Sequence, residues 1–286
     1  GWRSMKPKIS VVINTLNEEK NLPYALRSVS GWADEIIVVD MYSDDYTVEI
    51  AKEYGAKVFF HERIAAFDGA RQFAIDQASN EWILILDADE LVPKTLSKKL
   101  QEIAAMQLAD IVSIPRYNYL LGAHIKYSGW GPEQDRQKRF FRKGIAHASS
   151  KIHAFLHSLP EARVYNIPYE PDFAIIHFNY INCDHFLEKL NRYTNVEASQ
   201  AYDRGEKISI PKSLFLSAKE FLNRYFRKQG FRDGWRGFYL SLFMAFYRLS
   251  IYCKLIELKD VGTRSEVIAQ YHDEAERILS EYTKEN

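Results

Sequence analysis

The sequence predicts an α/β fold in which helices flank a mostly parallel sheet, followed by a C-terminal helical extension. In the first third of the chain, short apolar runs alternate with segments of helical period. Beyond His177 the pattern changes to long helical segments rich in aromatic and basic residues. With 286 residues, 47% of them hydrophobic, the chain can bury a sizeable core. We therefore expect an α/β domain over residues 5–180 and a helical extension over residues 181–286.

The expected strands are short runs of β-branched and aromatic residues, as is typical of strands buried on both faces of a sheet. They are Ile9–Ile13, Ile36–Val39, Val58–Phe60 and Trp82–Leu86. Between the second and third runs, residues 45–54 show helical spacing, with the capping residue Ser43 before them and Gly55 after them. This strand, helix, strand order predicts parallel strands joined by right-handed crossovers.

Residues 113–172 are rich in proline and glycine and predict loops with short strands rather than a disordered linker. We expect this segment to complete the α/β domain. We expect the natural protein to begin at Met5, because the preceding residues 1–4 do not have the apolar run of a signal peptide.

A helical hairpin is expected near the C-terminus. Apolar residues from Leu214 to Phe226 recur at helical spacing, and residues 230–234 separate them from a second helix over about 235–258. Residues 207–254 contain ten Lys or Arg and two acidic residues, a net charge of +8. Basic residues beside aromatic ones favour docking on an anionic membrane surface. The alternative is that the apolar stripe packs on the α/β domain or on a second copy of the chain.

Several classes of protein are disfavoured by composition. The longest charge-free stretch of this region, residues 237–247, is short of the roughly 20 residues that a membrane span needs. Equal numbers of basic and acidic residues, 38 of each, argue against non-specific nucleic-acid binding. Cys183 and Cys253 lie far apart in sequence and suit neither a disulfide framework nor a paired-cysteine metal site, so we expect a reducing cytoplasm.

Carboxylates follow two of the expected strands. Parallel sheets bind ligands outside the carboxyl ends of their strands. Asp87 and Asp89 come directly after the fourth apolar run, and such oxygen ligands suit Mg²⁺ or Mn²⁺ carrying a diphosphate. Asp40 ends the second run, where an acidic residue can bind a ribose or a base. The first run lacks a glycine fingerprint, so neither a dinucleotide site nor a P-loop is expected.

Four segments in a fixed order are more specific than any one of these motifs. They are Ser10–Glu19, Ala33–Asp40, Gly69–Ala74 and Trp82–Glu90. Together they resemble the family 2 glycosyltransferases of GT-A fold, a Rossmann-like arrangement. Four further segments are similar to the group that contains the lipopolysaccharide core β-glucosyltransferases. They are Trp130–Glu133, Arg139–Arg142, Ile176–Tyr180 and Lys189–Thr194.

The resemblance implies a sugar transfer, with inversion, from a nucleotide diphosphate donor, usually a UDP-sugar. The residues that it places along the donor are Thr15, Asn17, Glu18, Asp40, Arg71, Asp87 and Arg139. Asp40 would contact the uracil or the ribose, and Asp89 would hold Mn²⁺ or Mg²⁺ on the diphosphate. The metal then stabilises the departing nucleotide diphosphate by neutralising its charge.

Inversion in one step needs a base that deprotonates the acceptor hydroxyl. Glu133, in the loop after Trp130, is the first choice, and Asp135 is the second. This loop has about two more residues before Arg139 than the pattern of the group, so both carboxylates stay open.

The function expected from the sequence is therefore metal-assisted transfer to a glycolipid or lipopolysaccharide-core acceptor at the cytoplasmic face of the membrane. In this interpretation, assembly of the chain into a homo-oligomer stays open. One alternative is a glycosyltransferase that acts on a peptide or protein. Another is a nucleotide-sugar binding protein without catalysis, suggested by the altered loop at Glu133 and by Ala154.

Overall fold

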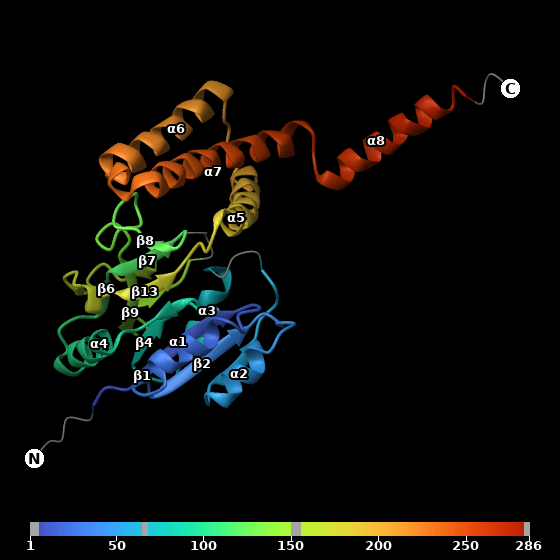
Figure 1. Cartoon of the computed structure of the whole chain (residues 1–286). Coiled ribbons are helices and arrows are strands. Elements are labelled where there is room, and N and C mark those ends of the chain that lie inside the picture. Colours follow the sequence, from blue (N-terminus) through green and yellow to red (C-terminus); the bar gives the residue numbers. More distant parts are fainter. Residues whose placement is uncertain (1–5, 65–67, 150–155, 283–286) are drawn as a thin grey trace, which may run out of the picture.

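A seven-stranded sheet forms the core of the α/β part of the protein in a computed structural model, which describes residues 6–64, 68–149 and 156–282 (Figure 1). The strand order is β12-β6-β9-β4-β1-β2-β3. The strands are β1 (Ile9–Thr15), β2 (Glu35–Asp40), β3 (Lys57–Phe60), β4 (Trp82–Ile85), β6 (Ile111–Ile114), β9 (Gln137–Arg142) and β12 (Val164–Asn166). Only β9 runs antiparallel to its neighbours in this sheet, so the expected mostly parallel sheet is confirmed.

Helices cover both faces of this sheet because alternate residues of each strand point to opposite sides. Val11, Ile13 and Leu84 share one core with α1, α2 and α4, whereas Val12 and Ile83 share another with α3. The helices are α1 (Leu22–Val29), α2 (Thr47–Glu53), α3 (Asp68–Gln77) and α4 (Lys94–Met106). The helix expected over residues 45–54 is thus present, slightly shortened.

A second, four-stranded sheet lies beside the first, in the order β5-β13-β7-β8, and the sequence analysis did not predict it. Its strands are β5 (Glu90–Leu91), β7 (Arg116–Leu120), β8 (Ala123–His124) and β13 (Ile175–Phe178). The remaining short elements of this region are β10 (Ala146–His147), β11 (His157–Ser158) and the 3-10 turn η1 (Pro171–Phe173). The second sheet brings β5, directly after the Asp87-x-Asp89 segment, next to β13.

Four helices make up the C-terminal part of the chain (Figure 1). They are α5 (Cys183–Asp203), α6 (Ile210–Leu222), α7 (Gly234–Asp260) and α8 (Arg264–Leu279), and the turns η2 (Asn223–Arg227) and η3 (Gly230–Asp233) join α6 to α7. The expected hairpin is therefore present, while α8 was not foreseen. The boundary between two domains at residue 180 stays a prediction.

A third apolar cluster attaches these helices to the second sheet. Leu120 and Trp130 pack in it with Phe186 of α5 and with Leu240 and Tyr247 of α7. One side of the α7 helix therefore packs within the protein. This agrees with the alternative in which the apolar stripe of the hairpin packs on the α/β domain.

Much of the opposite surface of the hairpin is apolar and exposed. Phe215, Phe226 and Trp235 are 66%, 56% and 56% exposed. Within the described ranges, Gly230–Asp260 is long and apolar enough to cross a membrane by length and composition alone, with 28% of its apolar window buried. No such segment was expected from the sequence, because its longest charge-free stretch in this region is short, whereas a mean hydropathy tolerates one or two charged residues.

Candidate active site

A cavity of about 820 Å³ opens at the carboxyl ends of β1 and β4 and extends to the helices α5 and α7. This is the edge where a parallel sheet places its ligands. The expected site residues that line it are Glu18, Arg71, Asp87, Asp89, Asp135 and Arg139. Those that do not line it are Thr15, Asn17, Asp40 and Glu133.

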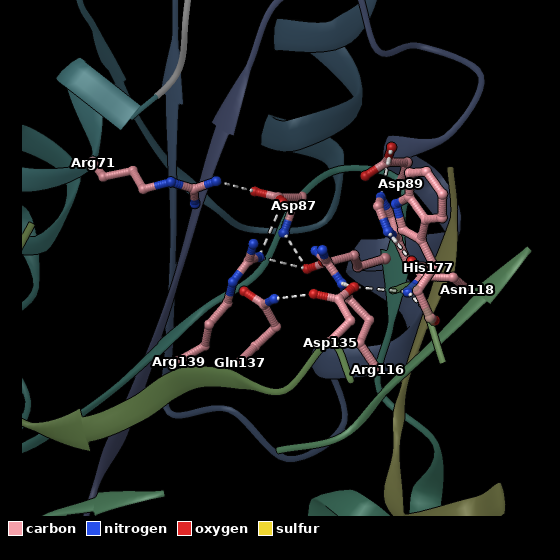
Figure 2. A network of polar contacts seen from close by, with 11 residues as sticks. Arg71, Asp87, Asp89, Arg116, Asn118, Asp135, Gln137, Arg139 and His177 are labelled. Carbon is pink, nitrogen blue, oxygen red and sulfur yellow. Dashed lines mark hydrogen bonds and ion pairs between the residues drawn. The ribbon is translucent and has the colours of Figure 1, made fainter. Parts of the chain in front are cut away.

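Asp87 is the first carboxylate after β4, and two arginines hold it (Figure 2). Arg71 of α3 donates to Asp87 Oδ1 at 3.0 Å, and Arg139 of β9 donates to Oδ2 at 2.9 Å. Burial alone would raise the pKa of Asp87, but Arg139 and Arg71 hold it far below its usual range. Asp87 is therefore ionised and fixed in position at neutral pH.

A buried carboxylate, Glu90, links this pair to the second sheet. Arg139 donates to Glu90 at 2.8 Å, and Arg116 of β7 donates to it at 3.0 Å. The Glu90 side chain also accepts the backbone N–H of Asp87 at 2.9 Å, which fixes the turn after β4. Arginine and carboxylate groups at this depth must be paired, because an unpaired buried charge is strongly destabilising.

Asp135 lines the cavity at the far end of the same network. Its Oδ2 atom accepts from Arg116 at 2.8 Å and from Asn118 at 2.7 Å, and its Oδ1 atom accepts from Gln137 at 2.7 Å. Burial alone would raise the pKa of Asp135, but Arg116 holds it below its usual range.

Glu133, the first choice for the base from the sequence, lies elsewhere. Its side chain is 62% exposed and pairs with Arg136 at 2.9 Å, and it is not among the described residues that line the cavity. The geometry thus favours the second choice, Asp135.

Asp89 lies next to His177 of β13, and both side chains line the cavity (Figure 2). Asp89 Oδ2 lies 3.3 Å from His177 Nε2. The other ring nitrogen, Nδ1, lies 2.7 Å from Asn118 Oδ1, while the Asn118 amide group donates to Asp135 and to the Trp130 carbonyl oxygen. Because the amide oxygen can only accept, His177 Nδ1 carries a proton, and Nε2 is the atom turned toward Asp89.

Asp89 and His177 fit a divalent cation. A carboxylate oxygen and an imidazole nitrogen with its second nitrogen fixed by a hydrogen bond are an ordinary donor set for Mn²⁺. No cluster of three or more His, Cys, Asp or Glu suited to a metal is found in the part of the chain that the structure describes. A cation here would therefore take further ligands from a diphosphate and water, as Mg²⁺ sites commonly do.

Glu18 follows β1 and lines the cavity with an unusual titration. Burial, and then the negative charge of Asp89, raise the pKa of Glu18 from 4.5 to about 7. Its carboxylate accepts from Asn21 at 3.1 Å, which limits the rise. The protonation of Glu18 therefore changes near neutral pH.

Thr15, Asn17 and Asp40 form a separate cluster where β1 and β2 end. Asp40 is fully buried and accepts from Thr15 Oγ1 at 2.7 Å and from the backbone N–H and hydroxyl of Ser43 at 2.7 and 2.6 Å. Asn17 accepts the backbone N–H of Asp44 at 2.8 Å. These contacts hold the loops after β1 and β2 together, and contact of Asp40 with a nucleotide stays a prediction.

Glu90, Arg116, Asn118 and His177 were not among the site residues expected from the sequence. These side chains meet only because β5, β7 and β13 form the second sheet. The available signal was the placement of His177 and Asn179 at the end of an apolar run, Ile175–Ile176, a pattern as common in cores as in sites.

The loop that carries Asp135 is held by the turns before α7. Asp233 accepts the backbone N–H groups of Lys126 and Tyr127, both at 3.0 Å, and the hydroxyl of Ser128 at 2.7 Å. Arg224 donates to the Ser128 carbonyl oxygen at 2.9 Å, and its guanidinium lies 4.5 Å from the Trp130 ring. The helical extension therefore holds this loop in place and also forms one wall of the cavity.

Comparison with known proteins gives a consistent result. The family model "Glycosyl transferase family 2" matches residues 10–159. The chain is 31% identical over 276 residues to the lipopolysaccharide core biosynthesis glycosyltransferase LpsC of Rhizobium meliloti, covering 92% of this chain and 98% of LpsC. It is 30% identical to an uncharacterized glycosyltransferase of Rickettsia typhi, covering 88% and 87%.

Solved structures that resemble the chain include S. aureus TarS 1–349 in complex with UDP, with a TM-score of 0.46, 18% identity, and coverage of 90% of this chain and 92% of TarS 1–349. Glucosyl-3-phosphoglycerate synthase from Mycobacterium tuberculosis, with Mn²⁺ and UDP, has a TM-score of 0.34 and 25% identity, covering 39% and 43%. The family model covers more than half of the chain, and LpsC matches it almost from end to end. The chain therefore belongs to glycosyl transferase family 2 and has the α/β architecture expected of its GT-A members.

Proposed function

We propose that this glycosyltransferase moves a sugar, with inversion, from a UDP-sugar to a glycolipid or lipopolysaccharide-core acceptor, with a divalent cation on the diphosphate. The observation that carries the proposal is the placement of Asp89 and His177 in one cavity with Asp135. A metal-binding pair and a candidate base on one cavity are the two components that an inverting transfer requires.

On the donor side, Asp89 and His177 would hold Mn²⁺ or Mg²⁺, which neutralises charge on the leaving diphosphate. Asp87 positions the turn after β4 through Arg71 and Arg139. Glu18 lines the same part of the cavity and is a candidate contact for the ribose.

On the acceptor side, Asp135 is the proposed base. Its lowered pKa keeps it ionised, so it can take a proton from a hydroxyl at neutral pH. Oδ2 is occupied by Arg116 and Asn118, whereas Oδ1 accepts from Gln137 and keeps a lone pair for a substrate hydroxyl.

Membrane docking of the hairpin is part of the proposal. A net charge of +8 over residues 207–254 lies beside exposed aromatic side chains, including Phe215 and Trp235. Such a surface combines attraction to anionic head groups with apolar contact at the acyl boundary. The name of LpsC supports an acceptor of the lipopolysaccharide core. Together with this surface it supports the proposed location at the cytoplasmic face of the membrane.

The test is a calorimetric titration of UDP with and without Mn²⁺, with GDP, CDP and NAD as controls. Selective UDP binding that strengthens with Mn²⁺ and weakens in Asp89→Ala supports the donor site. Equal binding of all the nucleotides, or none, contradicts it.

The acceptor is tested separately, on lipopolysaccharide-core oligosaccharides against unmodified peptides. Transfer to a peptide and not to a core oligosaccharide would favour the alternative of a peptide glycosyltransferase. UDP-sugar binding without turnover on either would favour a binding protein. Ala154, which suggested that alternative, lies outside the described residues.

A further inference from the structure

Arginines on the sheet side of the cavity are already paired with carboxylates. Arg71 contacts Asp87, Arg139 contacts both Asp87 and Glu90, and Arg116 contacts Glu90, all at 2.8 to 3.0 Å. An arginine committed to a carboxylate must loosen that pair before it can bind a phosphate, and the carboxylate left behind repels the same phosphate. These side chains therefore build the site but offer little free positive charge to a diphosphate.

Two cations on the opposite wall differ in this respect. Lys189 and Arg192 line the cavity from α5 at a spacing of three residues, which places them on one face of the helix. Neither has a carboxylate within 4.0 Å in the part of the chain that the structure describes. Instead, Lys189 Nζ lies 5.3 Å from the centre of the Tyr180 ring, and the Arg192 guanidinium lies 5.1 Å from the Tyr193 ring.

Contact with aromatic rings holds these side chains in place while leaving their hydrogen-bond donors available. A cation over an aromatic face keeps its full charge, whereas an ion pair cancels it. Lys189 and Arg192 are thus pre-positioned for an anion that enters the cavity.

The charge of Lys189 reaches the metal-binding end of the cavity. Burial raises the pKa of Asp89, whereas His177 and, to a smaller extent, Lys189 lower it, and Lys189 also opposes the rise in the pKa of Glu18. Lys138 of β9 also lines the cavity without a carboxylate within 4.0 Å in the described ranges, but it is not among the main charges that act on Glu18, Asp87 or Asp89. An anion that binds next to Asp89 would therefore lie close to Lys189, which is paired with no carboxylate among the described residues.

We propose that Lys189 and Arg192 bind the diphosphate of the donor, so that helix α5, and not the sheet, supplies the positive side chains for the leaving group. This inference rests on the proposed function and assigns a role to the Lys189–Thr194 segment, for which the sequence analysis gave none. Lysine and arginine both form strong charge-assisted hydrogen bonds with phosphate oxygens.

The role in the reaction follows from where charge develops. The acceptor oxygen forms a bond to the anomeric carbon and its proton passes to Asp135. The bond between that carbon and the diphosphate oxygen breaks, and its electron pair stays on the nucleotide diphosphate. Lys189 and Arg192 face the group on which this charge appears, so their contacts strengthen as the bond breaks and lower the barrier.

The test compares UDP with uridine, which lacks the phosphates, by titration against the intact chain in Mn²⁺. Lys189→Met and Arg192→Gln are each expected to weaken UDP binding by about tenfold and uridine binding by less than twofold. Lys189→Arg keeps the charge and should restore most of the UDP affinity. Lys138→Met, the matched control, removes a charge from the sheet wall of the same cavity and should weaken UDP binding by less than Lys189→Met does.

Three results would overturn the assignment. UDP affinity unchanged in both α5 variants, with the wild type binding UDP, would place the phosphates elsewhere. An equal loss in Lys138→Met would show a general charge effect and no specific site. If the wild type binds no UDP at all, the proposed function fails first and the assignment fails with it. Unfolding temperatures equal to that of the wild type would assign each loss of affinity to binding and not to misfolding. Arg192 is exposed, so its substitution is the one expected to affect folding least.

Discussion

The two walls of the cavity are built in opposite ways. On the sheet wall, Arg71, Arg116 and Arg139 are tied to Asp87, Glu90 and Asp135 in a balanced network (Figure 2). On the helical wall, Lys189 and Arg192 rest on aromatic rings. Charged side chains in this site therefore serve two purposes. Paired charges fix geometry, and unpaired charges are available to a ligand.

The same contrast extends to the outer surface. Apolar side chains of the central sheet are buried on both faces, whereas the hairpin of α6 and α7 exposes Leu214, Phe215, Phe226 and Trp235. Exposure of several large apolar side chains on one surface is typical of interaction surfaces. The helical part therefore carries cations held by aromatic rings on its cavity side and exposed aromatic residues on its outer side.

The largest expected effect separates two carboxylates of one loop. Asp135→Asn should lower kcat by about 10²- to 10⁴-fold, because the base that accepts the hydroxyl proton is lost. Glu133→Gln, the control, should change kcat by less than about twofold, since its exposed side chain contacts Arg136 outside the cavity. UDP affinity should stay near the wild-type value in both. The reverse ranking of the two kcat values would return the role of base to Glu133.

A stability comparison tests the two walls directly. Arg116→Met removes a partner of both Glu90 and Asp135 and should lower the free energy of unfolding by about 3–5 kcal/mol. Arg192→Met, which breaks no ion pair within the described residues, should lower it by less than about 1 kcal/mol. Urea unfolding monitored by circular dichroism measures both. Similar losses would mean that the two walls do not differ as described.

Glu18 gives a prediction on pH. Its pKa in the folded protein is about 7, above the ordinary value of 4.5, so ionisation favours the unfolded state. The resulting loss of stability begins near pH 4.5 and is complete above pH 7. Glu18→Gln removes this dependence and should gain about 3 kcal/mol relative to the wild type between pH 4.5 and pH 8. Urea unfolding of both proteins at several pH values checks it, and a constant difference would contradict the raised pKa.

The smallest expected effect concerns the outer surface. Phe226→Ser should weaken binding to anionic vesicles by about 1 kcal/mol, because it removes apolar area from the docking face. Tyr24→Ser on α1 is the matched control, since Tyr24 is 58% exposed and Phe226 is 56% exposed. Binding of the wild type should fall as salt rises, because the attraction of the basic residues is screened. Vesicle binding absent at low salt would count against the surface.

The sequence predicted those parts of the fold that local pattern determines. Strands such as Trp82–Ile85 and the helices of the hairpin follow from apolar spacing, and Asp87 and Asp89 stand out because they end a buried strand. The second sheet escaped prediction because its strands β5 and β8 are two residues long and carry no periodicity. The choice between Glu133 and Asp135 depends on the bend of one loop. Arg116 and Asn118 fix this bend by their hydrogen bonds to Asp135, and they lie 19 and 17 residues before it in the sequence.

The three hydrogen bonds to Asp233 reach residues 105 to 107 positions earlier in the chain. During synthesis the α/β part, with Asp87 and Asp89, leaves the ribosome well before Asp233 does. The loop that presents Asp135 acquires its final contacts only when the turn before α7 has formed. A nascent or truncated chain can therefore assemble the carboxylates of its donor site while its acceptor loop stays unfinished. The transferase becomes competent last, at about the moment when the hairpin of α6 and α7 folds.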